Sequence, residues 1–130
     1  MFNYRPYLKS LAEFMADRGY TVRPFPKFIL DNTDQGDDVF IKTGYFDPNS
    51  NGIRLFVFGR HPKDVLRTAA HELIHWKQQV NGDIEKSGYT GDKITEDKNL
   101  IRIESEAYLK GNMAFRSWTE TQQKTKGGLR

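Results

Sequence analysis

The chain has 130 residues, enough for one domain with its own hydrophobic core but too few for two. Its 20 Lys and Arg residues against 17 Asp and Glu residues give a net charge of +3, and the pI is near 9.1. This mild excess permits acidic partners without requiring nucleic acid. The absence of cysteine excludes disulfides and thiolate metal sites, so any metal must be held by His and carboxylate groups.

The sequence also bears on localisation. Residues 1–10 contain no apolar core of a signal peptide, and no run approaches the roughly 18 apolar residues of a membrane span. We therefore expect a soluble, intracellular, cytoplasmic protein with no membrane partner and no transmembrane segment.

The first half of the chain predicts one helix followed by short strands. Apolar residues recur at helical spacing over residues 6–18, and Gly19 is a suitable residue to end that helix. Strand-like segments follow at 25–30, 39–45 and 53–58. The last two flank a dense turn sequence that ends in Asn51-Gly52, so they are predicted to form a β-hairpin.

The second half predicts two longer helices. Pro62 suits a first helical turn, and Asn81-Gly82 would stop that helix after Val80. Residues 83–99 are polar and predict a loop, which would either gate a cleft or serve as a plain connector. A last helix is expected from about Asp97 to Trp118 or beyond, followed by a frayed polar tail over 119–130.

The most informative segment is His71-Glu72-Leu73-Ile74-His75, which has the H-E-x-x-H pattern of a zinc site on a helix. Residues four apart share a helix face, so both histidines can bind one ion. On a wheel of about 100° per residue the apolar stripe of this helix lies nearly opposite the two histidines. We therefore expect one face on the core and the other on a cleft; the alternative is two solvent-exposed histidines on an ordinary amphipathic helix.

Catalytic zinc usually takes three protein ligands, and the only other histidine is His61. His61 precedes the motif helix, where a surface or capping role is expected. Glu104 falls in the apolar stripe of the last helix, where a lone carboxylate is costly unless paired or bound to a metal. We expect Glu104 to be the third ligand and Glu106 to be solvated. The alternative for Glu104 is a buried salt bridge with Arg54 or Arg67.

These residues resemble a gluzincin metallopeptidase of the small kind called minigluzincins. The resemblance rests on His71 to His75 and on Glu104-Ser105-Glu106-Ala107, an E-x-x-A ligand helix. The stretches 43–60 and 68–78 are also similar to metallopeptidases of tailed phages. The resemblance implies an α+β, zincin-like single domain over residues 1–130, in which a small mixed sheet packs on an active-site helix and a ligand helix. Tyr108 stands where many relatives place Asp.

The implied activity is zinc-dependent hydrolysis of a peptide bond in an extended substrate. One Zn²⁺ would be held by His71, His75 and Glu104, with Glu72 as general base toward water. The substrate would pair with 53–58, acting as an edge strand over the cleft. An oxyanion would be stabilised by a further group, for which Tyr108 and Tyr89 are the candidates.

Three other functions remain open at this stage. The first is a DNA-associated, SprT-like protease, for which the basic tail residues Lys124, Lys126 and Arg130 are thin support. The second is a non-enzymatic zincin fold that serves as a binding or structural module, such as a virion component of a phage. The third is a metal-dependent hydrolase of a non-peptide bond. Substrate, cleavage preference and oligomeric state are not encoded in these patterns.

Overall fold

A computed structural model describes residues 2–36, 42–47, 50–80 and 98–123. Within these ranges the chain is a small α+β structure with three helices and a three-stranded mixed sheet. The elements, in order, are α1 (Arg5–Asp17), β1 (Lys27–Asp31), β2 (Gly44–Asp47), β3 (Gly52–Phe56), α2 (Pro62–Val80) and α3 (Lys98–Gln123). The expected helices and the strands at 25–30 and 53–58 are therefore present with their ends shifted by a few residues, whereas the strand expected at 39–45 is β2 at Gly44–Asp47, with residues 39–41 outside the described ranges.

The sheet has the order β1-β3-β2, with β1 parallel and β2 antiparallel to β3. The antiparallel pair is the predicted hairpin, although its segment 37–41 lies outside the described residues. The prediction that 53–58 is an edge strand is wrong. β3 is the central strand because β1, from before the hairpin, pairs along its other side. β2 is the edge that adjoins the cleft described below.

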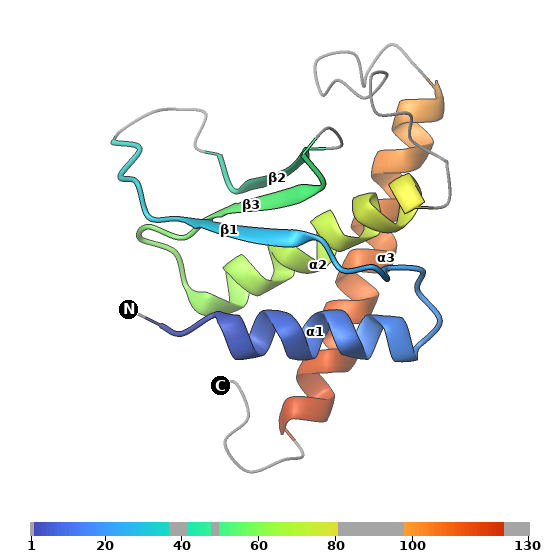
Figure 1. Ribbon diagram of the computed structural model, residues 1–130, viewed down its shortest axis with the longest axis horizontal. Coiled ribbons are helices and arrows are strands. Elements are labelled where there is room, and N and C mark those ends of the chain that lie inside the picture. Colours follow the sequence, from blue (N-terminus) through green and yellow to red (C-terminus); the bar gives the residue numbers. More distant parts are fainter. Residues whose placement is uncertain (1, 37–41, 48–49, 81–97, 124–130) are drawn as a thin grey trace.

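Helix α2 is the centre of the structure, and it contacts β2 and β3 on one side and α1 and α3 on others (Figure 1). Its Val65, Leu66, Ala69 and Leu73 are fully buried, as the apolar stripe predicts. Ala70 and Ile74 are also fully buried, so the helix is covered on more faces than its stripe indicated. The motif residues thus lie on a helix that is packed against other elements on several sides.

Helix α1 buries Leu8, Leu11, Ala12 and Met15, one residue per turn or so, on its inner face. The segment after it is fixed to α2, because the indole Nε1–H of Trp76 donates to the carbonyls of Val22 at 2.8 Å and Pro24 at 2.7 Å. These contacts orient the chain as it enters β1 and thereby place the sheet over α2.

Helix α3 continues through residues 119–123, which were expected to belong to a polar tail. Trp118 is fully buried and donates to the hydroxyl of Ser10 at 3.1 Å, which ties α3 to α1. Residues 124–130, which carry the basic tail positions, and residues 81–97, which include most of the expected loop, lie outside the described residues.

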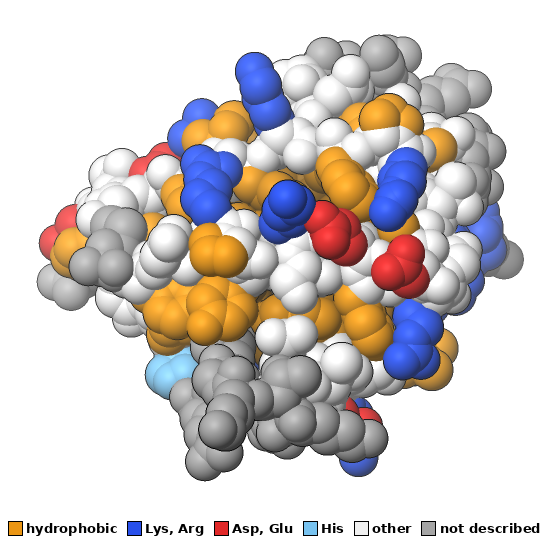
Figure 2. Space-filling view, turned by 60° about the horizontal axis from the view of Figure 1, so that its bottom comes forward, with side chains coloured by type: hydrophobic (Ala, Val, Ile, Leu, Met, Phe, Trp, Pro, Cys, Tyr) orange, Lys and Arg blue, Asp and Glu red, His pale blue; other side chains and the backbone are white. Residues whose placement is uncertain are grey.

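Figure 2 shows one face of the molecule, on which Lys and Arg side chains lie apart with hydrophobic and acidic side chains between them. Among the described residues on this face, the basic side chains do not form the continuous stripe that is typical of nucleic-acid binding. In the part of the chain that the structure describes, no helix combines the length and apolar character needed to cross a membrane.

Candidate metal centre

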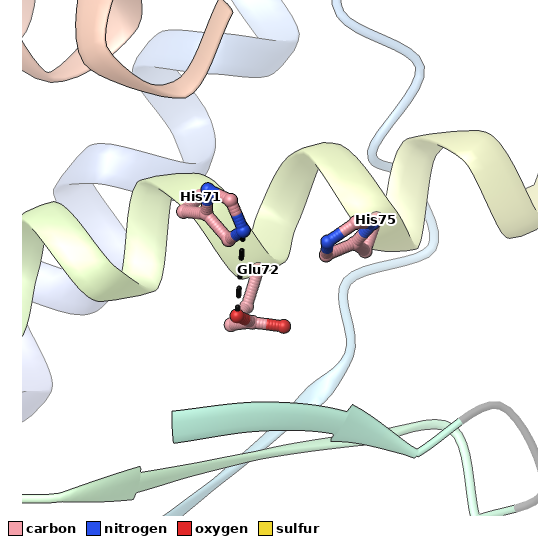
Figure 3. A group of neighbouring side chains, drawn as sticks. All are labelled: His71, Glu72 and His75. Atoms are coloured by element: carbon pink, nitrogen blue, oxygen red, sulfur yellow. Dashed lines mark ion pairs between the residues drawn. The ribbon is translucent and has the colours of Figure 1, made fainter. Parts of the chain in front are cut away.

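His71, Glu72 and His75 come from adjoining turns of α2 and converge on the side of the helix that lines the cavity described below (Figure 3). One ligand atom from each of them lies within 4.8 Å of the others. The Glu72 carboxylate extends between the two rings toward β2, with one oxygen 3.9 Å from His71 Nε2. The i, i+4 spacing of the two histidines produces this convergence.

Glu104 joins this cluster from α3. Its Oε1 lies 2.8 Å from His71 Nε2 and 3.0 Å from His75 Nε2. Ligands of a tetrahedral zinc ion, each about 2.05 Å from the metal, are separated by roughly 3.3 Å. The separation of Glu104 Oε1 from each imidazole nitrogen is therefore within about 0.5 Å of the ligand spacing in a two-His-one-Glu zinc site.

The alternative of an arginine salt bridge for Glu104 is contradicted. Arg54 pairs with Asp31 across the sheet at 3.0 Å, and Arg67 pairs with Asp64 in its own helix at 2.9 Å. His61 has the expected capping role, since its Nδ1 accepts from the backbone N–H of Lys63 at 3.1 Å, at the start of α2.

Glu106 is not the solvated residue that the helical wheel indicated. Its carboxylate accepts from Lys110 at 2.9 Å and from the side-chain amide of Gln78 at 2.9 Å, and lies 3.6 Å from Lys77 Nζ. The hydrogen bond from Lys110 is the largest of the effects that hold its pKa at about 2, below the ordinary 4.5. Lys77 and Gln78 come from α2, so a wheel of α3 alone could not reveal these partners.

The electrostatics of the cluster favour a positive charge between the rings. Burial raises the pKa of the Glu72 carboxyl, and nearby His75 and His71 only partly oppose this effect. Burial also opposes ionisation of Glu104, but hydrogen bonds with both histidines outweigh it and hold that pKa well below its usual range. Burial lowers the pKa of His75, yet its contacts with Glu104 and Glu72 raise it overall.

The cluster opens into a cavity of about 400 Å³. Its walls come from three elements: the strand β2 with Thr43 before it, the helix α2, and the helix α3. The lining residues beyond the four site residues are Thr43, Gly44, Tyr45, Phe46, Arg67, Thr68, Tyr108 and Asn112. The expected split of α2 into a core side and a cleft side is therefore present.

Among the described strands β2 has a neighbour on one side only, and it lines this cavity. Thr43 and Phe56 share a backbone hydrogen bond at 3.1 Å, and in an antiparallel pair hydrogen-bonded and non-hydrogen-bonded positions alternate. Gly44 and Phe46 consequently direct their backbone polar groups away from β3. One of these groups, the backbone N–H of Phe46, donates a hydrogen bond to the Glu72 carboxylate.

Two glycines allow the cavity walls to approach α2. A Cβ on Gly44 would lie 2.8 Å from Thr68 Cγ2, and a Cβ on Gly111 would lie 2.9 Å from His71 Cα. Distances below 3.0 Å cannot be tolerated without movement, so a side chain at either position would displace β2 or α3.

Arg60 fixes the same wall from the other end. Its guanidinium donates to the carbonyls of Thr43 at 3.0 Å, Phe56 at 2.9 Å and Asp64 at 3.2 Å, and to the Thr68 hydroxyl at 2.9 Å. One side chain thus joins β2, β3 and α2. Arg60, Gly44, Gly111 and Gln78 were not identified from the sequence, because their roles depend on contacts between separate elements.

Of the two tyrosines considered for the oxyanion, Tyr108 lies at the cavity and Tyr89 lies outside the described residues. The Tyr108 ring meets His71 edge-on, with centroids 5.1 Å apart, and 64% of the residue is exposed. Its position on α3, one turn beyond Glu104, brings it beside the histidine that the ligand helix covers.

Comparison with known proteins finds no matching family model, no matching curated protein and no matching solved structure.

Proposed function

We propose that this chain is a zinc-dependent endopeptidase with a zincin-like fold. The observation that carries the proposal is the convergence of His71 Nε2 and His75 Nε2 on one oxygen of Glu104, beside the Glu72 carboxylate. This donor set of two imidazoles and one carboxylate suits Zn²⁺ and matches the chemistry of catalytic zinc. The order of helix, sheet, motif helix and ligand helix supports the same class.

In this proposal each residue has one role. His71, His75 and Glu104 hold the ion, and Glu72 accepts a proton from the attacking water and returns it to the leaving amine. When bound, zinc supplies a Lewis acid for the carbonyl oxygen and lowers the pKa of water. The raised pKa of Glu72 brings this carboxyl nearer to neutral pH, where a general base works best.

The substrate is proposed to be an extended peptide that pairs with β2. The backbone groups of Gly44 and the carbonyl of Phe46 are directed away from β3 at the cavity, which favours addition of a strand over insertion of a helix. This position replaces the pairing with 53–58 expected from the sequence. Tyr108 is the candidate for oxyanion stabilisation because it lies at the same cavity, next to His71.

The test compares the wild type with Glu104→Ala and Glu72→Gln. Each protein is stripped of metal, reloaded with zinc, and assayed for zinc per chain by elemental analysis and for cleavage of an unfolded protein. We expect one zinc in the wild type and in Glu72→Gln, little in Glu104→Ala, and a loss of turnover of about 10²-fold or more in Glu72→Gln. If the folded wild type bound no zinc after incubation with excess zinc, the proposed zinc peptidase would be excluded.

The same experiment distinguishes the other functions. Bound zinc without cleavage of any peptide would favour a binding module or a hydrolase of another bond. Cleavage that requires DNA would favour a SprT-like protease, and its salt dependence would report the phosphate contacts. No observation on the described residues favours any of these three functions over the proposed peptidase.

A further inference from the structure

Gln78 lies one turn after His75 on α2 and is 1% exposed. Its side-chain amide makes three contacts: Oε1 lies 2.8 Å from His75 Nδ1, and Nε2 donates to the Ile103 carbonyl at 2.8 Å and to Glu106 Oε1 at 2.9 Å. A buried polar side chain with all three contacts inside the protein has a defined orientation.

The partners of Gln78 determine which of its ends carries the oxygen. A backbone carbonyl and a carboxylate are both acceptors, so the atom that faces them must be the NH₂ group. The reverse orientation would bring two pairs of acceptors together. The oxygen of Gln78 therefore faces His75, and the hydrogen bond between them requires a proton on His75 Nδ1.

This proton selects one form of the neutral imidazole. A neutral ring carries one N–H, so a proton on Nδ1 leaves a lone pair on Nε2 for an ion to bind. Nε2 faces the candidate metal centre and shares a hydrogen bond of 3.0 Å with Glu104 Oε1, and a bound ion would take the place of that hydrogen bond. By accepting a hydrogen bond from Nδ1, the Gln78 amide oxygen leaves Nε2 as the ring nitrogen that a metal would bind.

Glu106 is the residue that holds the amide in place. Lys110 contacts its second oxygen at 2.9 Å and Lys77 lies 3.6 Å from its first, so the carboxylate is ionised and remains an acceptor for Gln78. Lys77 is 13% exposed in its side chain and Glu106 21%, which limits screening by solvent. A chain of contacts therefore runs from the lysines through Glu106 and Gln78 to His75.

We propose that Gln78 and Glu106 are positioning residues of the metal centre, which fix the Nδ1–H form of His75 and present its Nε2 to the ion. This inference rests on the proposed metal function. Contacts that orient a ligand histidine in this way typically change metal affinity by 10–100-fold when removed.

The first experiment measures zinc affinity with a competing chelator dye. Gln78→Leu keeps the volume but removes the acceptor, and we expect its zinc affinity to fall by about 10–100-fold. Glu106→Ala keeps Gln78 but removes the carboxylate that accepts from its amide, and we expect a smaller loss of zinc affinity in the same direction. Val65→Ala, a core substitution on the same helix, is the control that destabilises the fold without changing zinc affinity.

The second experiment reads the ring itself by long-range ¹H–¹⁵N correlation of the histidines in metal-free protein. We expect a hydrogen-bonded Nδ1 proton on His75 in the wild type, whatever Nε2 carries, and the loss of that hydrogen-bonded proton in Gln78→Leu. This result does not depend on zinc, so it judges the positioning role even if the wild type binds no metal.

A wild type that binds one zinc, together with a Gln78→Leu variant of equal affinity and unchanged histidine spectrum, would overturn the inference while leaving the proposed peptidase intact. A wild type that binds no zinc would instead remove the proposed function, and the histidine spectra would then decide whether Gln78 orients His75.

Discussion

Gly111 on α3 lies against the backbone of His71 on α2, so closely that a β-carbon at position 111 would come within 2.9 Å of His71 Cα. This contact sets the distance between α2 and α3 at a point on α3 that lies two turns after Glu104. Because Glu104 reaches both histidines from α3, the geometry of the candidate metal centre depends on an interhelical contact that involves the His71 backbone but no ligand side chain.

Gly111→Ala should therefore weaken zinc binding without altering any ligand. Alanine favours a helix by up to about 1 kcal/mol over glycine, so helix propensity alone predicts a gain in stability. Overpacking typically costs about 1–3 kcal/mol, and we expect it to outweigh that gain. Denaturant unfolding and chelator competition measure the two effects. Met113→Ala on the exposed side of the same helix is the control, and a more stable Gly111→Ala protein with normal zinc affinity would contradict the prediction.

Arg60→Ala should lower the free energy of unfolding by about 2–4 kcal/mol. The substitution leaves the carbonyls of Thr43 and Phe56 without this donor, and hydrogen bonds that involve a charged group contribute about 1.5–3 kcal/mol each. Arg60→Lys keeps the charge but cannot reach all four acceptors, so an intermediate loss is expected. A loss below about 0.5 kcal/mol in Arg60→Ala would show that β2 is held by other contacts.

Glu106 should give the protein an acid-sensitive increment of stability. Its pKa is about 2 in the folded protein against an ordinary 4.5, so the folded state binds this proton less tightly than the unfolded state. The contribution is fully present above about pH 4.5 and is lost as the pH falls toward 2. The difference in unfolding free energy between wild type and Glu106→Gln, measured from pH 7 to pH 2, should shrink over this interval. A constant difference would contradict it.

Zinc should stabilise the folded chain by mass action. At a free zinc concentration of 100 times Kd, binding to the folded state alone adds about 2.7 kcal/mol. Chelation of the wild type should therefore lower the unfolding midpoint, and readdition of zinc should restore it. His75→Ala should show neither change, because one of the two imidazole ligands is missing. Equal zinc responses of the two proteins would locate the stabilising ion elsewhere.

Tyr108→Phe tests the oxyanion role separately from the metal. The variant keeps the ring contact with His71 and removes only the hydroxyl. If that hydroxyl stabilises the oxyanion, kcat should fall by about 10²-fold while zinc affinity and KM change little. Unchanged kcat would limit Tyr108 to packing against His71, and the search would move to other residues at the cavity.

The sequence predicted those parts of the site that depend on one helix at a time. Pro62 marked the start of α2, and the i, i+4 spacing of the motif placed His71 and His75 together, whereas the predicted stop at 81–82 lies outside the described residues. Glu104 was found because a carboxylate in an apolar stripe requires a partner. These patterns are local, so a single sequence contains them in full.

Contacts between elements could not be predicted in the same way. The parallel pairing of β1 with β3 joins segments separated by the whole of β2, and this pairing determines that β2 is the edge. The glycines at 44 and 111 are informative only once the opposing backbone is known. Glu106 was misjudged for the same reason, since its partners Gln78 and Lys77 belong to the other helix.

The position of β2 at the rim of the sheet has a consequence for protein engineering. Gly44 and Phe46 are constrained by their contacts with the motif helix, whereas Tyr45 is exposed. Replacing Tyr45, while keeping Gly44, Phe46 and the Thr43 carbonyl that Arg60 holds, would therefore change one wall of the cavity and leave the donor side chains of α2 and α3 in place. Under the proposed function, variants at this one position offer a route to new cleavage preferences on an unchanged set of donor side chains.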